Sequence, residues 1–115
     1  MYLVYDYAQR GSLGDVLYSV FGGLIFEWAM RVNVIRGMAH ALAYLHNDCS
    51  PNIFHRDISI NNVLLDGDFE PKVSDFGTAK LLTHDASNWT AIVGSYGYIA
   101  PGNKTRIPSV HSYFL

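Results

Sequence analysis

The chain has 115 residues, half of them hydrophobic and 14% aromatic, which suits one small globular domain and excludes a low-complexity disordered protein. Its formal net charge is −2 with no basic stripe, which argues against nucleic-acid binding and against a polybasic membrane anchor. No stretch reaches the ~18 apolar residues of a membrane span, no signal peptide is visible, and the single cysteine, Cys49, fits a reducing compartment.

The first part of the chain predicts a short strand followed by a helix. Residues 2–5 (Tyr-Leu-Val-Tyr) indicate a short buried strand, and residues 6–11 its exit. Ser12 is a favourable N-cap, and apolar residues recur after it at helical spacing. Residues 21–26 are apolar and are interrupted by Gly22-Gly23, so this segment is expected to associate with other apolar surfaces if it is exposed.

Residues 27–46 carry the longest helical pattern of the chain, which we interpret as scaffold. Ser50-Pro51 is expected to end this helix, because the residue before a proline disfavours helical backbone angles. One apolar face at spacings of three and four is predicted to comprise Trp28, Val32, Ile35, Met38, Ala39, Leu42 and Leu45.

A β-hairpin is predicted next. The apolar run at residues 63–65 and the returning residues 72–75 are its arms, and Asp66-Gly67-Asp68 is a turn signal. This pairing places Asn62 opposite Asp75, with Asp57 in the loop just ahead of Asn62.

Two carboxylates and a carboxamide are therefore expected at the open end of this hairpin. All three offer hard oxygen ligands and are too few to cage an ion alone, which suits Mg²⁺ shared with substrate phosphates. The alternative is a polar hairpin end with solvated acids, because Asp-rich hairpin ends are common.

The same stretch resembles the catalytic loop and metal-binding motif of protein kinases, H-R-D-x-x-x-x-N followed by D-F-G. Residues 55–57, Asn62 and residues 75–77 match in type, order and separation. The resemblance implies that Asp57 accepts or orients the proton of the substrate hydroxyl, and that Asn62 and Asp75 hold the Mg²⁺ ions that bridge the ATP phosphates. It also implies that Arg56 contacts a phosphorylated residue of the activation segment.

Further roles follow from the same resemblance. Tyr5 would be the gatekeeper residue, and the backbone groups of Asp6 to Ala8 would hydrogen-bond the adenine of ATP, although an ordinary edge strand is the alternative for this segment. Leu64 would form the floor of the adenine pocket, and His55 would be a packed structural histidine. Ser59 stands where many serine/threonine kinases carry a lysine that touches the transferred phosphate, which removes a positive charge from that position.

The segment after Gly77 resembles the kinase activation segment. Its candidate phosphorylation sites are Thr83, Ser87, Thr90 and Ser95. Residues 94–101 resemble the substrate-binding loop, in which Ser95 would help to position the substrate hydroxyl and would favour serine/threonine over tyrosine substrates. The letters LAYLHNDCSPNIFHRD are similar to those of plant leucine-rich-repeat receptor-like kinases.

The expected fold class is α+β, a partial protein-kinase-like fold with hinge, first large-lobe helices, catalytic-loop hairpin and activation segment. The small lobe is expected to be missing, because the 115 residues hold no Gly-x-Gly-x-x-Gly loop and no Val-Ala-Ile-Lys strand. The helices that follow the activation segment in the family are expected to be missing as well. Residues 1–101 are expected to be the partial kinase domain. Residue 102 is Gly where the family pattern has Glu, and residues 102–115 are expected to be an unrelated disordered tail.

The expected function is phosphoryl transfer from Mg·ATP to serine or threonine hydroxyls of a protein substrate, in the cytoplasm, with the truncated chain inactive alone. The alternative is a non-catalytic interaction fragment that binds or competes with a full-length receptor-like kinase. A small Ca²⁺-binding protein is rejected, because the later ligands of an EF-hand loop are absent after Asp66-Gly67-Asp68.

Overall fold

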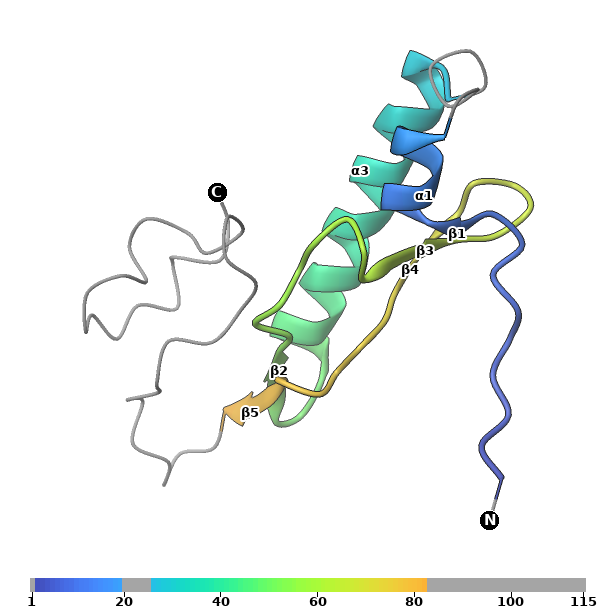
Figure 1. The fold of residues 1–115 in the computed structure, drawn as a ribbon. Coiled ribbons are helices and arrows are strands. Elements are labelled where there is room, and N and C mark those ends of the chain that lie inside the picture. The colour runs from blue at the N-terminus through green and yellow to red at the C-terminus, as the bar shows by residue number, and fades with distance from the viewer. Residues whose placement is uncertain (1, 20–25, 83–115) are drawn as a thin grey trace. The chain divides into compact units, whose positions relative to one another are not determined.

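The computed structural model of the chain describes residues 2–19 and 26–82 (Figure 1). These residues fall into two compact units. The first comprises the described residues 2–19, 26–41 and 60–74, and the second comprises residues 42–59 and 75–82. Helices and antiparallel strands build both units, in agreement with the predicted α+β class.

The first unit contains a three-stranded antiparallel sheet in the order β1-β3-β4. The strands are β1 (Gly11–Ser12), β3 (Val63–Leu65) and β4 (Pro71–Val73). Leu65 lies between Gly11 on one side and Pro71 on the other. The predicted hairpin is therefore confirmed, whereas its pairing with residues 11–12 was not predicted.

The register of the hairpin differs by one residue from the prediction. Val63 pairs with Val73, and the Asn62 carbonyl accepts hydrogen bonds from the Ser74 N–H (2.8 Å) and the Ser74 hydroxyl (3.0 Å). Asn62 is thus opposite Ser74 and not Asp75. The reason is the five-residue turn 66–70, in which the Asp66 carboxylate accepts the N–H groups of Asp68 and Glu70, each at 2.9 Å.

Two helices accompany this sheet. Helix α1 (Leu13–Tyr18) has Ser12 as its N-cap, as predicted. The Ser12 hydroxyl accepts the Asp15 N–H at 3.0 Å, and the Asp15 carboxylate accepts the Ser12 N–H at 2.8 Å. Helix α3 (Trp28–Ala43) confirms the long predicted helix.

The buried face of the helical segment agrees with the predicted one only in part: Met38 packs against the core and Leu45 is buried, as predicted, but other predicted members are exposed. Val34 is 4% exposed, whereas Trp28 and Ile35 are 75% and 66% exposed. The helix has apolar residues on more than one side, so periodicity alone did not define which stripe faces inward. Met30, Val34 and Met38, four residues apart, join the core.

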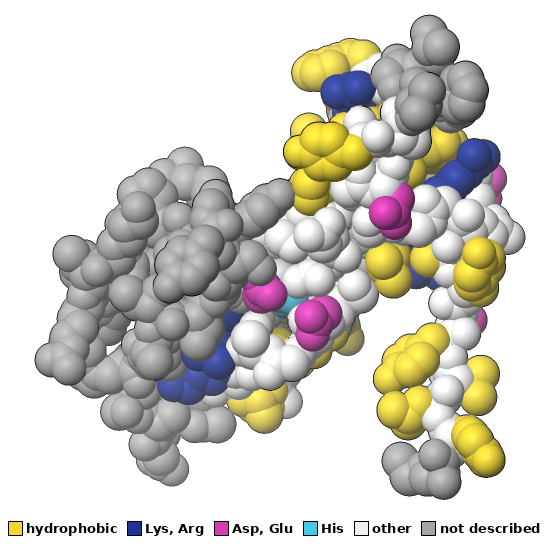
Figure 2. Space-filling model, in the orientation of Figure 1, with side chains coloured by type: hydrophobic (Ala, Val, Ile, Leu, Met, Phe, Trp, Pro, Cys, Tyr) yellow, Lys and Arg dark blue, Asp and Glu magenta, His cyan; other side chains and the backbone are white. Residues whose placement is uncertain are grey.

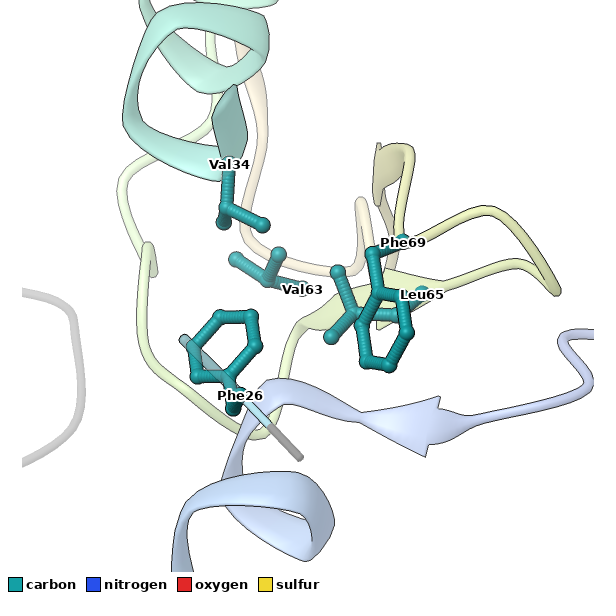
Figure 3. Close-up of a cluster of buried hydrophobic side chains, with 5 residues drawn as sticks. All are labelled: Phe26, Val34, Val63, Leu65 and Phe69. Carbon is teal, nitrogen blue, oxygen red and sulfur yellow. The ribbon is translucent and has the colours of Figure 1, made fainter. Parts of the chain in front are cut away.

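The core of the first unit is a cluster of five buried side chains, Phe26, Val34, Val63, Leu65 and Phe69 (Figure 3). Gly37 lets α3 approach the sheet closely, because a Cβ at this position would lie 2.5 Å from Cγ of Pro71. The absence of a side chain at Gly37 therefore allows the hairpin to pack closely against α3.

Residues 2–5 do not form the predicted buried strand. They have no regular structure, and Tyr2, Val4 and Tyr5 are each at least 80% exposed. Hydrophobic side chains stand out along this segment in Figure 2. Among the described residues no strand pairs with the segment, so its run of apolar residues has no sheet in which to be buried.

The second unit contains the end of the helical segment and a two-stranded sheet. A π-helical turn, η1 (Tyr44–Asp48), continues α3 and ends with the Cys49 N–H donating to the Tyr44 carbonyl at 3.1 Å. Strand β2 (Asn52–Phe54) pairs antiparallel with β5 (Lys80–Leu82), with Ile53 opposite Leu81. This pairing brings the ends of residues 55–79 together.

Candidate functional site

His55, the first residue after β2, is a packed side chain, as expected. It is 1% exposed, and its ring meets the Phe76 ring edge-on at 4.8 Å between centroids. Its Nδ1 atom accepts the Asp57 N–H at 3.2 Å. The histidine therefore fixes the backbone of the residue predicted to receive the substrate proton.

Arg56 and Thr78 tie the loop after β2 to the loop before β5. The Arg56 Nε–H donates to the Thr78 carbonyl at 2.6 Å, and the Thr78 hydroxyl donates to the His55 carbonyl at 3.2 Å. With the His55–Phe76 ring contact, these bonds join residues 55–57 and 75–78 within one unit. The role of Thr78 was not predicted, because a single hydroxyl two residues after Phe76 carries no spacing signal.

Asp75 adopts a left-handed backbone conformation with φ of 56°. Its carboxylate is exposed, and Oδ1 accepts the Gly77 N–H at 3.2 Å. Arg56 is also left-handed, with φ of 69°. Such conformations are costly for residues with a Cβ and concentrate at functional sites, and neither can be read from letters alone.

Asn62 belongs to the first unit, whereas Asp57 and Asp75 belong to the second. Its backbone is fixed by Ser74, the residue immediately before Asp75 in the chain. The joint arrangement of the three side chains stays a prediction. Their donor chemistry, two carboxylates and one amide carbonyl, fits Mg²⁺, which prefers hard oxygen ligands and keeps waters of its own.

The residues expected at the adenine lie in the first unit. The Ala8 carbonyl accepts the Gly11 N–H at 3.1 Å, and an Asp6 carboxylate oxygen is 3.9 Å from Lys72 Nζ. Leu64 is half-buried in β3, between Ser12 and Lys72. Their contact with a nucleotide stays a prediction. Ser95 and the other activation-segment hydroxyls lie outside the described residues.

Ser59 and His46 are two buried polar residues of the second unit. Ser59 is 5% exposed, so the position that carries a lysine in many serine/threonine kinases holds a small buried hydroxyl here. His46 is 8% exposed and lies against the Phe54 ring at 4.8 Å, and burial lowers the pKa of this imidazole. Across residues 2–19 and 26–82, no helix has the length and apolar character to cross a membrane.

Comparison with known proteins identifies the family. The family model described as protein kinase domain matches residues 1–104. The chain is similar to MDIS1-interacting receptor like kinase 2 of Arabidopsis thaliana, with 56% identity over 100 residues, covering 87% of this chain and 10% of that protein. It is also similar to the LRR receptor-like serine/threonine-protein kinase FEI 2 of the same plant, with 50% identity, covering 96% of this chain and 20% of that protein.

A receptor-like protein kinase of Ipomoea nil is 45% identical over 118 residues, which cover 96% of this chain and 11% of that protein. The chain thus spans between about a tenth and a fifth of the length of these curated relatives. The predicted resemblance is confirmed: the chain belongs to the protein kinase domain family, and its relatives are plant receptor-like serine/threonine kinases.

Proposed function

We propose that this chain carries the catalytic loop and the metal-binding loop of a receptor-like serine/threonine protein kinase. The observation that supports this most directly is the connection of residues 55–57 to residues 75–78 by the Arg56–Thr78 and Thr78–His55 hydrogen bonds. Two loops that are far apart in the sequence, and that hold two acids, are joined in one unit. Phosphoryl transfer depends chiefly on such positioning.

In the proposed mechanism Asp57 orients the substrate hydroxyl and receives its proton, while His55 holds the Asp57 backbone. Asn62 and Asp75 would hold Mg²⁺ through oxygen atoms, and the Gly77 N–H fixes one Asp75 oxygen. When bound, Mg²⁺ neutralises charge on the ATP phosphates. Arg56 would pair with a phosphorylated activation-segment residue through its remaining N–H groups.

The nucleotide would lie on the first unit. The backbone groups of Asp6 and Ala8 would bind adenine, with Leu64 beneath it. Because the Ala8 carbonyl already accepts the Gly11 N–H, we assign the Ala8 N–H to the nucleotide. Ser95 would position a serine or threonine hydroxyl of the protein substrate, and the reaction would take place in the cytoplasm. We assign residues 1–101 to the kinase segment and residues 102–115 to a separate tail.

The 115-residue polypeptide by itself is expected to transfer phosphate very slowly or not at all. It contains no Gly-x-Gly-x-x-Gly loop and no Val-Ala-Ile-Lys strand. Each such electrostatic element accounts for about 10²–10³ in rate when removed. Ser59 also leaves out the lysine charge near the transferred phosphate.

The test is incubation of the purified chain with Mg·ATP and a generic protein substrate, beside the Asp75→Ala variant. The expected result is no transfer above the level of the variant. Measurable transfer that disappears in Asp75→Ala would contradict the proposed inactivity of the chain alone and would support the role of Asp75.

The proposed metal ligands can be tested without activity. Titration with paramagnetic Mn²⁺ is expected to broaden the NMR signals of Asn62, Asp75 and their neighbours, and Asp75→Ala is expected to abolish this broadening. Asp68→Ala, which changes an exposed acid of the hairpin turn, is the matched control and is expected to leave it unchanged. Broadening that persists in Asp75→Ala would exclude the proposed ligand.

A second candidate is the non-catalytic fragment that binds a full-length receptor-like kinase. The exposed Trp28 and Ile35 on α3 favour it, because large apolar side chains in contact with water are common at protein interfaces. Co-purification with such a kinase, weakened by Ile35→Glu and unchanged by Arg36→Glu, would support it. Absence of any complex at micromolar concentration would exclude it.

A further inference from the structure

Two arginines and two phenylalanines form a continuous stack that joins three segments of the first unit. The Arg10 guanidinium lies over the Phe69 ring at 4.5 Å, and Phe69 stacks on Phe26 with centroids 5.8 Å apart. At the other end, the Arg31 guanidinium lies over the Phe26 ring at 5.3 Å, and its Nε–H donates to the Phe26 carbonyl at 2.9 Å. None of these three contacts was predicted from the sequence.

Arg10 is bound to the hairpin by its backbone and by its side chain. The Arg10 N–H donates to the Leu65 carbonyl at 3.1 Å, and an Nη2–H donates to the Gly67 carbonyl at 3.4 Å. Gln9 lies so close to the same turn that a Cβ at Gly67 would collide with its side chain. Residues 9 and 10 therefore hold the hairpin turn from one side.

Phe69 is held rigidly for this contact. It is 8% exposed and has a left-handed backbone with φ of 61°, a costly conformation for a residue with a Cβ. Its N–H donates to the Asp66 carbonyl at 3.1 Å inside the five-residue turn. The turn thus presents the ring of Phe69 to Arg10 in a fixed orientation.

The stack marks the point at which the N-terminal segment becomes fixed. Residues 2–7 are exposed and have no regular structure, whereas from Ala8 onwards the backbone is bonded, first by the Gly11 N–H to the Ala8 carbonyl. Cation–aromatic contacts of this kind contribute most where the ring is buried. Arg10 is the first side chain of the segment with such a contact to the core.

We propose that Arg10 and Phe69 are positioning residues of the nucleotide site: together they hold residues 8–11 on the hairpin turn and so fix Ala8, whose backbone N–H would bind adenine. This inference rests on the proposed function for the adenine contact, whereas the holding of residues 8–11 stands independently of it. The position of Ala8 in the nucleotide site then depends on the hairpin turn that holds it.

Amide hydrogen exchange of the full 115-residue chain tests the holding. Arg10→Ala is expected to raise exchange at the Arg10 and Gly11 amides about 3- to 30-fold, the range that loss of one cation–aromatic contact corresponds to. Arg31→Ala is the matched control, because it removes the same kind of contact at the far end of the stack. It is expected to raise exchange near residues 26–31 only.

Arg10→Lys keeps the charge without the planar guanidinium group and is expected to raise exchange at residues 10 and 11 by a smaller factor than Arg10→Ala. If Arg10→Ala does not fold, this variant tests the proposal instead. Unchanged exchange at residues 10 and 11, or an equal increase across β4 and α3, would overturn the proposal. So would an equal increase at residue 10 in Arg31→Ala.

A titration with ADP, followed by NMR, tests the adenine contact separately. Arg10→Ala is expected to weaken ADP binding by a factor similar to its exchange effect, while Arg31→Ala leaves binding unchanged. If the unsubstituted chain binds no ADP, the adenine assignment of the proposed function fails. The hydrogen-exchange measurement then decides by itself whether Arg10 holds residues 8–11.

Discussion

His46 is a buried imidazole whose protonation opposes folding. Burial lowers its pKa, because the charged form loses hydration in the folded state. The unfolded chain therefore binds a proton near the ordinary pKa of about 6.5, while the folded chain does not. The contribution to stability is complete above that pH and falls as the pH drops towards the lower folded pKa.

We therefore expect the chain to be less resistant to urea at pH 5 than at pH 7.5, with His46 responsible for part of the loss. His46→Phe keeps a ring beside Phe54 and should reduce the pH dependence between these values. His40→Gln, a change at an exposed histidine of α3, serves as the control and should keep it. An identical pH dependence in His46→Phe would contradict the assignment.

Ser12 and Asp15 determine where α1 begins. Ser12→Ala removes the hydroxyl that accepts the Asp15 N–H and is expected to cost about 1 kcal/mol of local stability. Ser12→Thr keeps the oxygen and should cost much less. Amide exchange along residues 13–18 measures the difference, and equal exchange in the two variants would exclude the cap as the cause.

The same cap gives α1 a pH dependence of its own. Hydrogen bonds from the backbone and the side chain of Ser12 lower the pKa of Asp15, since they favour its carboxylate. The cap is thus intact above the ordinary carboxyl pKa and weakens as the pH falls below it.

Gly37 determines how closely α3 approaches the hairpin. A Cβ at residue 37 would meet the rigid Pro71 ring at 2.5 Å, so Gly37→Ala is expected to destabilise the first unit by about 1–3 kcal/mol, although alanine favours helix. Thermal unfolding of Gly37→Ala beside Ala39→Gly, a change at an exposed helix position, measures the effect. A stabilised Gly37→Ala chain would show that the helix can move away from Pro71 at little cost.

Local signals in the sequence predicted the elements but not all of their partners. Ser12 with Asp15, and Asp66-Gly67-Asp68, act through hydrogen bonds within four residues, so sequence reasoning placed the helix start and the turn correctly. The register error at Asn62 arose because the five-residue turn depends on the left-handed backbone of Phe69, which no residue pattern reveals. The inward face of α3 depended on the hairpin that covers it.

The candidate site was predictable in composition and not in geometry. The letters of residues 55–57 and 75–77 indicated the kinase family, which the comparisons confirm. The hydrogen bonds of Thr78 to Arg56 and His55 join residues more than twenty positions apart in the sequence, and the left-handed backbone of Arg56 and Asp75 leaves no mark in the residue pattern. Spacing within a motif contains no information about them.

At the scale of the whole chain, stability depends on small cores. Leu65 is 0% exposed at the centre of the first unit, and its replacement by alanine is expected to cost about 2–5 kcal/mol, a large part of the total stability of a small domain. Leu81→Ala, at a strand position that is 52% exposed, is the control and should cost far less. Urea unfolding followed by circular dichroism compares the two, and similar midpoints would contradict the importance of this core.

Arg56, Phe69 and Asp75 each hold a backbone shape that glycine would adopt without penalty. At each position a change to glycine relieves about 1 kcal/mol or more of backbone strain. At Phe69 it also removes a buried core side chain, which costs more than the strain, so stability alone would favour glycine only at Arg56 and Asp75. Side chains that persist against such a gradient are expected to be kept for what they bind. A search for more stable versions of this chain should therefore meet a conflict at Arg56 and Asp75, where the gain in stability would remove a side chain that we propose for the active centre.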